Sequence, residues 1–177
     1  DLPKARDYYQ DAQLRLERKA SDGDPVALYC MGEIDFVLEP TNVRRAVHRF
    51  EQAARAGYPA AQATFGSLCM QGFNVPRDVQ RGMQLLLQAA RSNSLPARFN
   101  LGMAHYSGDG VPLDLTKAVR WFRLAANQNF DQGQYILGTL LLEEDGVYHD
   151  KKEGLRLLEL AASQGHPGAT ETLHGLG

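Results

Sequence analysis

Gly108 and Gly110, which lie just before an amphipathic segment, are the residues of this sequence that most suggest chemistry. A glycine-rich loop that opens a helix can hold a phosphate group with its backbone N–H groups. This loop lacks the Lys-Ser/Thr that a P-loop carries after its second glycine, and its spacing does not match the GxGxxG pattern of dinucleotide sites. No strand is predicted before it. We therefore interpret the loop as a helix breaker that needs the free dihedral angles of glycine.

Histidine, cysteine and acidic residues are not spaced as metal or catalytic sites require. None of the five histidines lies four residues from another, so no HExxH site is present. Cys69 and His105 would form a nucleophile and its base only if the fold happened to bring them together. The acidic run Glu143–Gly146 lacks the DxDxDG ligand order of a calcium loop, and no GxSxG elbow occurs. We expect no catalytic residue, no metal site and no cofactor.

The composition is that of a globular protein without a nucleic-acid or membrane signature. The chain has 177 residues, a hydrophobic fraction of 44% and a formal net charge of −2. This length is enough for one domain with a continuous core, and the charge provides no basic field for nucleic acid or anionic lipid. No apolar run approaches the roughly 18 residues of a membrane-spanning helix. Cys30 and Cys69 lie in apolar helical contexts, so we expect buried thiols rather than a disulfide.

An internal repeat explains the glycine loop better than a binding site does. An Ala-Ala pair recurs at a step of 36 residues, as Ala53-Ala54, Ala89-Ala90, Ala125-Ala126 and Ala161-Ala162. An acidic residue keeps this step at Asp78, Asp114 and Asp150, with Asn42 in the first copy. A bulky apolar residue keeps it at Phe50, Leu86, Phe122 and Leu158. Such a period is typical of a solenoid built from stacked copies of one supersecondary unit.

Two further positions of each copy indicate turns and close helix packing. One carries glycine or asparagine, which tolerate the left-handed conformation after a helix C-terminus, at Gly57, Asn93, Asn129 and Gly165. The other is always glycine, at Gly32, Gly66, Gly102 and Gly138, where the first step is 34 residues and implies a two-residue deletion. A position without a side chain permits close approach between two helices.

Each copy is predicted to be a pair of helices, which we call helix A and helix B. In the third copy, helix A runs from about residue 97 to residue 106, with apolar residues at helical spacing. Two glycines and a proline then end the helix. Asp114 is predicted to cap helix B by accepting from its free N–H groups. Ala118 and Phe122 lie on the apolar face of helix B, and only stacking of neighbouring pairs can bury these faces.

The stretch ARFNLGMAHYSGDGVPLDLTKAVRWFRLAANQN resembles a Sel1-like repeat, a relative of the tetratricopeptide repeat. The resemblance is carried by Ala97, Leu101, Gly102, Gly108, Gly110, Val111, Asp114, Lys117, Ala118, Trp121, Ala125 and Ala126, while His105 replaces the usual tyrosine. The second copy departs at Cys69, Asn74 and Gly82, the fourth at Leu141, Glu144 and Gly154, and the first has FVLEPTN in place of the glycine loop. The resemblance covers about residues 25–167. It implies an all-α fold, a right-handed αα-superhelix, with a binding role and no catalysis.

We expect a single solenoid domain over residues 1–177. Its predicted parts are an N-terminal capping helix at 3–23, repeats at 25–59, 60–95, 96–131 and 132–167, and a partial C-terminal helix at 168–177. The polar stretch KARDYYQDAQLRLERK suits a cap, whereas the C-terminal end has no evident polar cap.

The resemblance also predicts that a partner binds in a concave groove formed by the A helices, at positions −3, +1 and +4 from the A-helix glycine. In the first two repeats these are Tyr29, Glu33, Phe36, Ala63, Ser67 and Met70. In the last two they are Phe99, Met103, Tyr106, Tyr135, Thr139 and Leu142. Aromatic residues and methionine are frequent anchors at interfaces. The alternative is that these side chains pack between adjacent A helices, which applies most to Tyr29, Phe99 and Tyr135.

The distribution of basic residues agrees with a groove of low positive charge. Of 19 Lys and Arg residues, only Arg98 falls in a predicted helix A. The groove is therefore expected to be apolar to mildly acidic, and the outer face mixed. This arrangement does not provide the basic track of a nucleic-acid-binding protein.

We therefore expect a non-catalytic module that binds another protein, with no nucleic-acid partner and no membrane insertion. The resemblance favours a bacterial adaptor or an inhibitor (immunity) protein, with a secreted effector or an envelope component as partner. Two alternatives are a cell-wall or peptide-directed enzyme, which needs a polar cleft with perturbed titratable groups, and a scaffold that self-assembles through its C-terminal end. The chain starts at Asp1 without Met or a signal-like segment, so its terminus does not indicate a compartment. Bacterial periplasm is favoured over cytoplasm.

Overall fold

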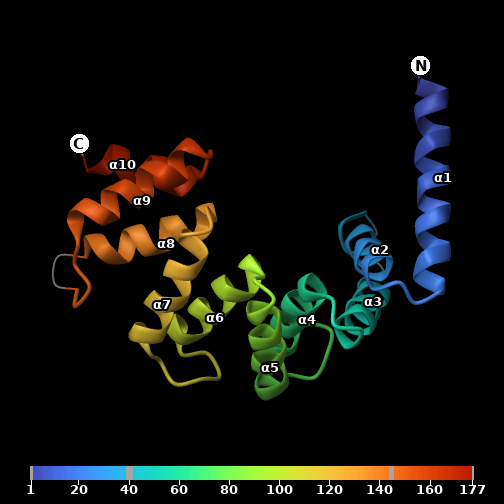
Figure 1. Ribbon diagram of the computed structural model, residues 1–177, viewed down its shortest axis with the longest axis horizontal. Coiled ribbons are helices and arrows are strands. Elements are labelled where there is room, and N and C mark those ends of the chain that lie inside the picture. Colours follow the sequence, from blue (N-terminus) through green and yellow to red (C-terminus); the bar gives the residue numbers. More distant parts are fainter. Residues whose placement is uncertain (1, 39–41, 144–145, 177) are drawn as a thin grey trace. The chain divides into compact units, whose positions relative to one another are not determined.

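The computed structural model describes residues 2–38, 42–143 and 146–176, with side chains from Ala12 onward except that of Leu38. These residues form ten α-helices and no strand (Figure 1). In chain order the helices are α1 (Leu2–Ser21), α2 (Pro25–Leu38), α3 (Val43–Arg55), α4 (Pro59–Gln71), α5 (Val79–Arg91), α6 (Leu95–Ser107), α7 (Leu115–Ala126), α8 (Asp131–Leu142), α9 (Lys151–Ser163) and α10 (Pro167–Gly175). The predicted all-α fold of consecutive helix pairs is confirmed.

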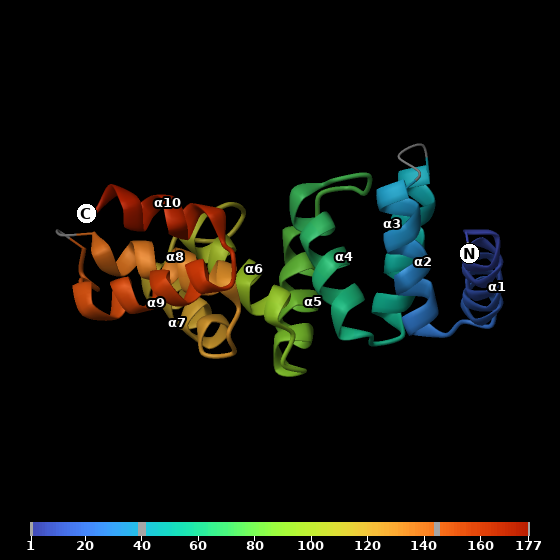
Figure 2. The same cartoon turned by 90° about the horizontal axis from the view of Figure 1, so that it is seen from above.

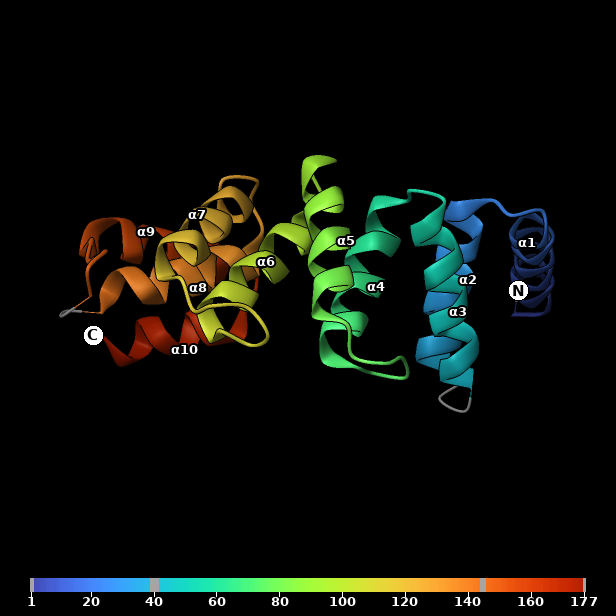
Figure 3. The same ribbon diagram turned by 90° about the horizontal axis from the view of Figure 1, so that it is seen from below.

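The helices pair as A and B helices of four repeats, and the chain divides into two compact units. Repeats 1 to 4 are α2–α3, α4–α5, α6–α7 and α8–α9, with α1 before them and α10 after them. Unit 1 spans Asp1–Ala97 and unit 2 spans Arg98–Gly177. In unit 1, α2 packs on α3 and α4 packs on α5 (Figure 2), and in unit 2, α8 packs on α9 and α9 on α10 (Figure 3). The single continuous domain stays a prediction.

Aspartate caps start three of the four B helices. The side chains of Asp78, Asp114 and Asp150 each accept a hydrogen bond from the backbone N–H three residues later, at 2.9 to 3.0 Å. This bond satisfies one of the N–H groups that have no partner inside the helix. The prediction for Asp114 is confirmed. Asn42, in the same register, makes no side-chain cap bond to α3.

A left-handed residue ends the turn after each B helix. Gly57, Asn93, Asn129 and Gly165 have φ angles of 84°, 67°, 62° and 87°, as predicted from their residue types. In repeat 1 the N–H of Gly57 donates to the carbonyl of Ala54, and the next N–H donates to the carbonyl of Ala53. The Ala-Ala pair thus supplies the acceptors of a Schellman-type turn, which directs the chain into the next A helix.

In repeats 1 and 3 the A-helix glycine packs against an aromatic ring of helix B. A Cβ atom placed on Gly32 would lie 2.6 Å from Cε1 of Phe50, and one placed on Gly102 would lie 2.5 Å from Cε1 of Phe122. Both rings are fully buried. The ring therefore fills the space that a side chain on the A helix would otherwise occupy.

In repeats 2 and 4 the A-helix glycine meets a second glycine, on helix B. A Cβ atom placed on Gly66 would lie 3.0 Å from the carbonyl oxygen of Gly82, and one placed on Gly138 would lie 3.0 Å from that of Gly154. Repeats 1 and 3 carry alanine in the register of this second glycine. The four repeats thus use two packings, ring on glycine and glycine on glycine, in alternation.

Each unit has its own buried apolar cluster. In unit 1 it runs from α1 through α4 and includes Phe50 and Phe65. In unit 2 it includes Phe122 and Leu137, and a smaller cluster around Leu158 joins α9 to α10. Both cysteines are free thiols, as predicted, but only Cys69 is fully buried, and Cys30 is half-buried.

Gly82→Ala should lower the free energy of unfolding by up to about 2 kcal/mol. An alanine gains about 1 kcal/mol of helix propensity over glycine, but overpacking costs about 1–3 kcal/mol. The new Cβ would lie 2.6 Å from the Gly66 carbonyl oxygen and would collide with Met70. Urea unfolding followed by circular dichroism measures the change. Gly175→Ala is the control, because no atom lies within 4 Å of its Cβ position; stabilisation of both variants would contradict the proposed contact.

An ion-pair network joins repeats 1 and 2. The Glu51 carboxylate of α3 accepts hydrogen bonds from Arg81 of α5 at 2.7 Å and from Arg55 at 2.8 Å. The Arg81 guanidinium also lies 4.9 Å from the centre of the Phe65 ring, a favourable cation–π position. The hydrogen bond from Arg81 holds the pKa of Glu51 below its ordinary value of 4.5, although burial opposes this.

Glu51→Gln should reduce stability at neutral pH by less than about 1 kcal/mol, because ion pairs of this exposure are weak. Because the folded pKa of Glu51 is lowered, its contribution is complete above the unfolded pKa and is lost as the pH falls through the folded pKa. The difference in unfolding free energy between wild type and variant should therefore shrink between pH 6 and about pH 3. Chemical unfolding at several pH values measures it. A gap that stays constant over this range would show that Glu51 does not stabilise through its charge.

Candidate protein-binding faces of the A helices

The side chains predicted to meet a partner lie on the A helices, and each unit presents its own set. We call the set in unit 1 the first face: Tyr29, Glu33, Phe36, Ser67 and Phe73. We call the set in unit 2 the second face: Phe99, Met103, Tyr106, Tyr135, Thr139 and Leu142. Phe73 was not predicted from the sequence. Ala63 and Met70 were predicted, but both are buried.

The rings at position −3 pack mainly within the solenoid. Each contacts the residue that precedes the next A helix. Tyr29 lies 5.4 Å from Tyr58 and Phe99 lies 5.6 Å from Phe130, measured between ring centres. Tyr135 stacks on His166 at 4.4 Å. These half-buried rings join neighbouring repeats, in line with the alternative considered for them, and expose only part of their surface to a partner.

Repeat 2 lacks this aromatic contact. Small residues occupy both registers, Ala63 at position −3 and Ser94 before α6. The boundary between the two compact units lies a few residues after Ser94, between Ala97 and Arg98. The division of the chain thus falls where the sequence omits the ring pair found after the other three repeats.

Position +4 is exposed in repeats 1 and 3 but not in repeats 2 and 4. Phe36 is 39% exposed and Tyr106 is 38% exposed, whereas Met70 is only 9% exposed and Leu142 is half-buried. The cause is the glycine on helix B in repeats 2 and 4, since Met70 and Leu142 fill the space above Gly82 and Gly154. Met70 therefore offers a partner almost no surface, and we remove it from the candidate site.

Phe36 and Tyr106 are held in place by edge contacts with the core. The Phe36 ring lies 6.3 Å from Phe50, and the Tyr106 ring lies 6.3 Å from Phe122 at an interplanar angle of 65°. Such aromatic contacts are favourable in tilted and edge-on geometries. These side chains are therefore exposed and supported from below.

Phe73 extends the exposed aromatic surface of the first face. It lies in the turn after α4, between Gly72 at φ 72° and Asn74 at φ 55°. It is 43% exposed and lies edge-on to Phe36 at 6.2 Å. The signal in the sequence was the replacement of the GDG turn of repeat 3 by a turn containing phenylalanine.

Position +1 carries an acid in repeat 1, a thioether in repeat 3 and a hydroxyl in repeats 2 and 4. Glu33 is exposed, and Met103 is half-buried against the core of unit 2. The hydroxyl of Ser67 donates to the carbonyl of Ala63 at 3.1 Å, and that of Thr139 donates to the carbonyl of Ile136 at 2.9 Å. Glu33 is thus the one charged side chain at these positions.

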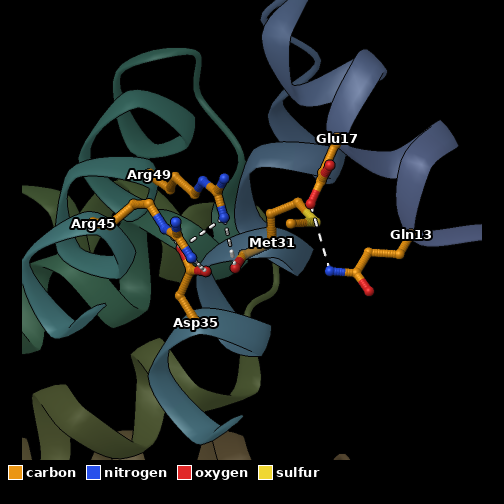
Figure 4. Close-up of polar contacts among 6 residues, drawn as sticks. All are labelled: Gln13, Glu17, Met31, Asp35, Arg45 and Arg49. Atoms are coloured by element: carbon orange, nitrogen blue, oxygen red, sulfur yellow. Dashed lines mark hydrogen bonds and ion pairs between the residues drawn. The ribbon is translucent and has the colours of Figure 1, made fainter. Parts of the chain in front are cut away.

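A second acid on α2, Asp35, is part of the structure and not of the first face. Its side chain is 1% exposed and receives two guanidinium groups from α3 (Figure 4). Arg45 donates to both carboxylate oxygens, at 2.9 and 2.6 Å. Arg49 donates to the carboxylate at 2.6 Å and to the carbonyl of Met31 at 3.2 Å. The cluster fixes α3 against α2. Sequence reasoning did not find it because the other repeats carry Cys69, His105 and Leu141 in the register of Asp35, and none of these is an acid.

The repeat geometry agrees with a match to a known family model. The model described as Sel1 repeat matches residues 26–58, 59–94, 95–130 and 131–166, which is most of the chain. The chain belongs to the Sel1 repeat family. The resemblance inferred from the third copy is confirmed, and Sel1 repeats are commonly a protein-interaction module.

Solved Sel1 repeat structures share this fold. A protective antigen present in uropathogenic Escherichia coli strains is 31% identical, with a TM-score of 0.78 over 91% of this chain. A Sel1 repeat protein from Oxalobacter formigenes is 24% identical, with a TM-score of 0.84; the match covers 94% of this chain and 69% of that one. This chain spans 35% of the length of the E. coli protein. Among curated proteins no match is found.

Within the described ranges, no three His, Cys, Asp or Glu side chains lie close enough to share a metal ion. The acidic run considered as a calcium loop contains residues 144–145, which lie outside those ranges. Burial raises the pKa of the Cys69 thiol, so little nucleophilic thiolate forms. No described helix is both long and apolar enough to cross a membrane.

Met70→Ser and Phe36→Ser should differ in their effect on stability. The buried Met70 side chain should cost about 2–4 kcal/mol when it is shortened, whereas the half-exposed Phe36 ring should cost about 1 kcal/mol. Thermal unfolding under matched conditions measures the two changes. Equal losses would mean that Met70 and Phe36 are similarly packed, and that repeats 1 and 2 do not differ in the proposed way.

Proposed function

We propose that this protein is a non-catalytic interaction module that binds another protein through the first and second faces. The observation that carries the proposal is the exposure of supported aromatic rings on the A-helix side, at Phe36, Phe73 and Tyr106. Aromatic side chains with few rotatable bonds provide large contact area at low entropic cost, and they dominate many interfaces. The rings of Phe36 and Tyr106 contact the core rings of Phe50 and Phe122, and the Phe73 ring contacts Phe36. These contacts order the side chains before a partner arrives, which lowers the cost of binding.

The remaining residues of the two faces complete the proposed site. In unit 1 these residues are Tyr29, Glu33 and Ser67. In unit 2 the corresponding residues are Phe99, Met103, Tyr135, Thr139 and Leu142. The five A-type helices α2, α4, α6, α8 and α10 contain a single Lys or Arg residue, Arg98. This composition supports a protein partner and disfavours nucleic acid.

The biological role that we propose is that of a bacterial adaptor or of an inhibitor (immunity) protein for a secreted effector. Its support is the family and the bacterial origin of the solved structures that share the fold. A toxin gene next to the encoding gene would favour the inhibitor. A longer parent protein with further domains would favour the adaptor.

The triple variant Phe36→Ser, Phe73→Ser, Tyr106→Ser should weaken partner binding at least about 100-fold, because each lost anchor of about 1–2 kcal/mol reduces affinity roughly tenfold. The partner is first captured on the immobilised wild-type protein from an extract of the source organism and identified by mass spectrometry. Its dissociation constant is then measured with the purified proteins. Circular dichroism should show unchanged helix content.

The matched control is Leu87→Ser, Leu115→Ser, Leu124→Ser. These leucines lie on B helices and are 36%, 42% and 43% exposed. Their exposed fractions are similar to those of Phe36, Phe73 and Tyr106. They should leave affinity within about threefold of wild type. A control variant that loses the partner while the aromatic variant keeps it would place the interface on the B helices and refute the proposal.

A further inference from the structure

Among the described side chains, no cation forms an ion pair with Glu33, the exposed carboxylate of the first face. It lies three residues before Phe36 on α2, so the two side chains are neighbours on one helix face. Tyr29 lies four residues before Glu33 on α2, about one helical turn away, so these two side chains are also neighbours. Burial, and to a lesser degree the charge of Glu33, raises the pKa of Tyr29, so the hydroxyl stays protonated and can donate. In the described part of the chain, Glu33 belongs to none of the ion pairs.

The nearby basic residues are engaged elsewhere. Helices α2 and α4, which carry the first face, contain no Lys or Arg. On α3, Arg45 and Arg49 bind the buried Asp35. On α5, Arg81 binds Glu51. These three arginines are therefore already paired with other acids, and the Glu33 carboxylate is available to a cation of another molecule.

An apolar anchor site lies beside this carboxylate. Phe36 and Phe73 are both exposed and meet edge-on at 6.2 Å, one from α2 and one from the turn after α4. Exposed ring faces bind apolar side chains, and they also attract the guanidinium or ammonium group of a neighbouring cation. A carboxylate beside a pair of aromatic rings favours a partner that carries a basic side chain next to an apolar one.

We propose, on the basis of the proposed function, that the first face binds a protein segment that presents a Lys or Arg beside an aromatic or branched aliphatic residue. The cation pairs with Glu33, and the apolar side chain rests on Phe36 and Phe73. The two partner side chains lie about 5–6 Å apart, the separation of Glu33 and Phe36 on one helix face.

The other repeats supply an internal contrast. The register of Glu33 is occupied by Ser67, Met103 and Thr139 in repeats 2 to 4. The second face therefore has no acid in this register, and the preference for a cation belongs to the first face. Glu159 is an exposed glutamate on the B helix α9 and serves as the matched control.

The test uses phage-displayed random 16-residue peptides selected on the full chain. Peptides selected on wild type should be enriched in Lys or Arg together with an aromatic or aliphatic residue. Selection on Glu33→Gln should lose the basic enrichment and keep the apolar one, and selection on Phe36→Ser, Phe73→Ser should lose both. Glu159→Gln should select as wild type does.

One selected peptide is then synthesised and titrated by fluorescence anisotropy. Glu33→Gln and replacement of the peptide Lys by Gln should each weaken binding about 5–10-fold, and the two changes together should weaken it little more than either alone. Strictly additive effects, peptides without basic residues, or no selected peptide at all would each overturn the inference. The proposed function has its own separate outcome, because loss of the captured partner from the triple aromatic variant does not depend on the chemistry of Glu33.

Discussion

The close contact between helix A and helix B at the A-helix glycine is the constraint on which the rest of the structure depends. No side chain fits there, because the space is taken by Phe50 or Phe122 in repeats 1 and 3 and by the helix backbone at Gly82 or Gly154 in repeats 2 and 4. Interiors packed at crystal density leave no room for an additional methyl group without displacement. The choice between ring and glycine also decides what happens one turn later at position +4. Where helix B carries alanine opposite the A-helix glycine, the side chain at position +4 stays at the surface. Where helix B carries glycine, the side chain at position +4 packs into the space above that glycine.

This coupling explains why binding surface and core cannot be separated in this solenoid. Repeats 1 and 3 expose an aromatic ring at position +4, whereas in the same register repeat 2 buries Met70 and repeat 4 half-buries Leu142. Exposed apolar area is therefore divided into small patches, and small patches limit non-specific association. The core rings of Phe50 and Phe122 contact Phe36 and Tyr106 from below. The packing that stabilises each repeat therefore also orders its exposed aromatic side chain.

Local signals were predicted from the sequence, and contacts between distant residues were not. Asp114 caps its helix and Asn129 adopts a left-handed conformation because these properties depend on a few neighbouring residues. Met70 was predicted to be exposed because its register matches that of Phe36, but its burial is decided by Gly82 on the next helix. The Asp35–Arg45 pair was not predicted, since no other repeat has an acid in the register of Asp35 and a single acid gives no indication of its partner. Likewise, Phe73 belongs to a turn whose course follows from the φ angles of its neighbours.

The measurement that tests the central claim most directly is site-specific photocrosslinking in the source organism. The photoreactive amino acid p-benzoylphenylalanine is introduced singly at Phe36, Tyr106, Leu87 or Leu124, which are similarly exposed but lie on A helices or on B helices. If the A helices bind the partner, the same crosslinked protein should appear with Phe36 or Tyr106 replaced and be absent with Leu87 or Leu124 replaced. A partner that crosslinks from the two leucine positions alone would show that the B helices form the interface, and would contradict the account.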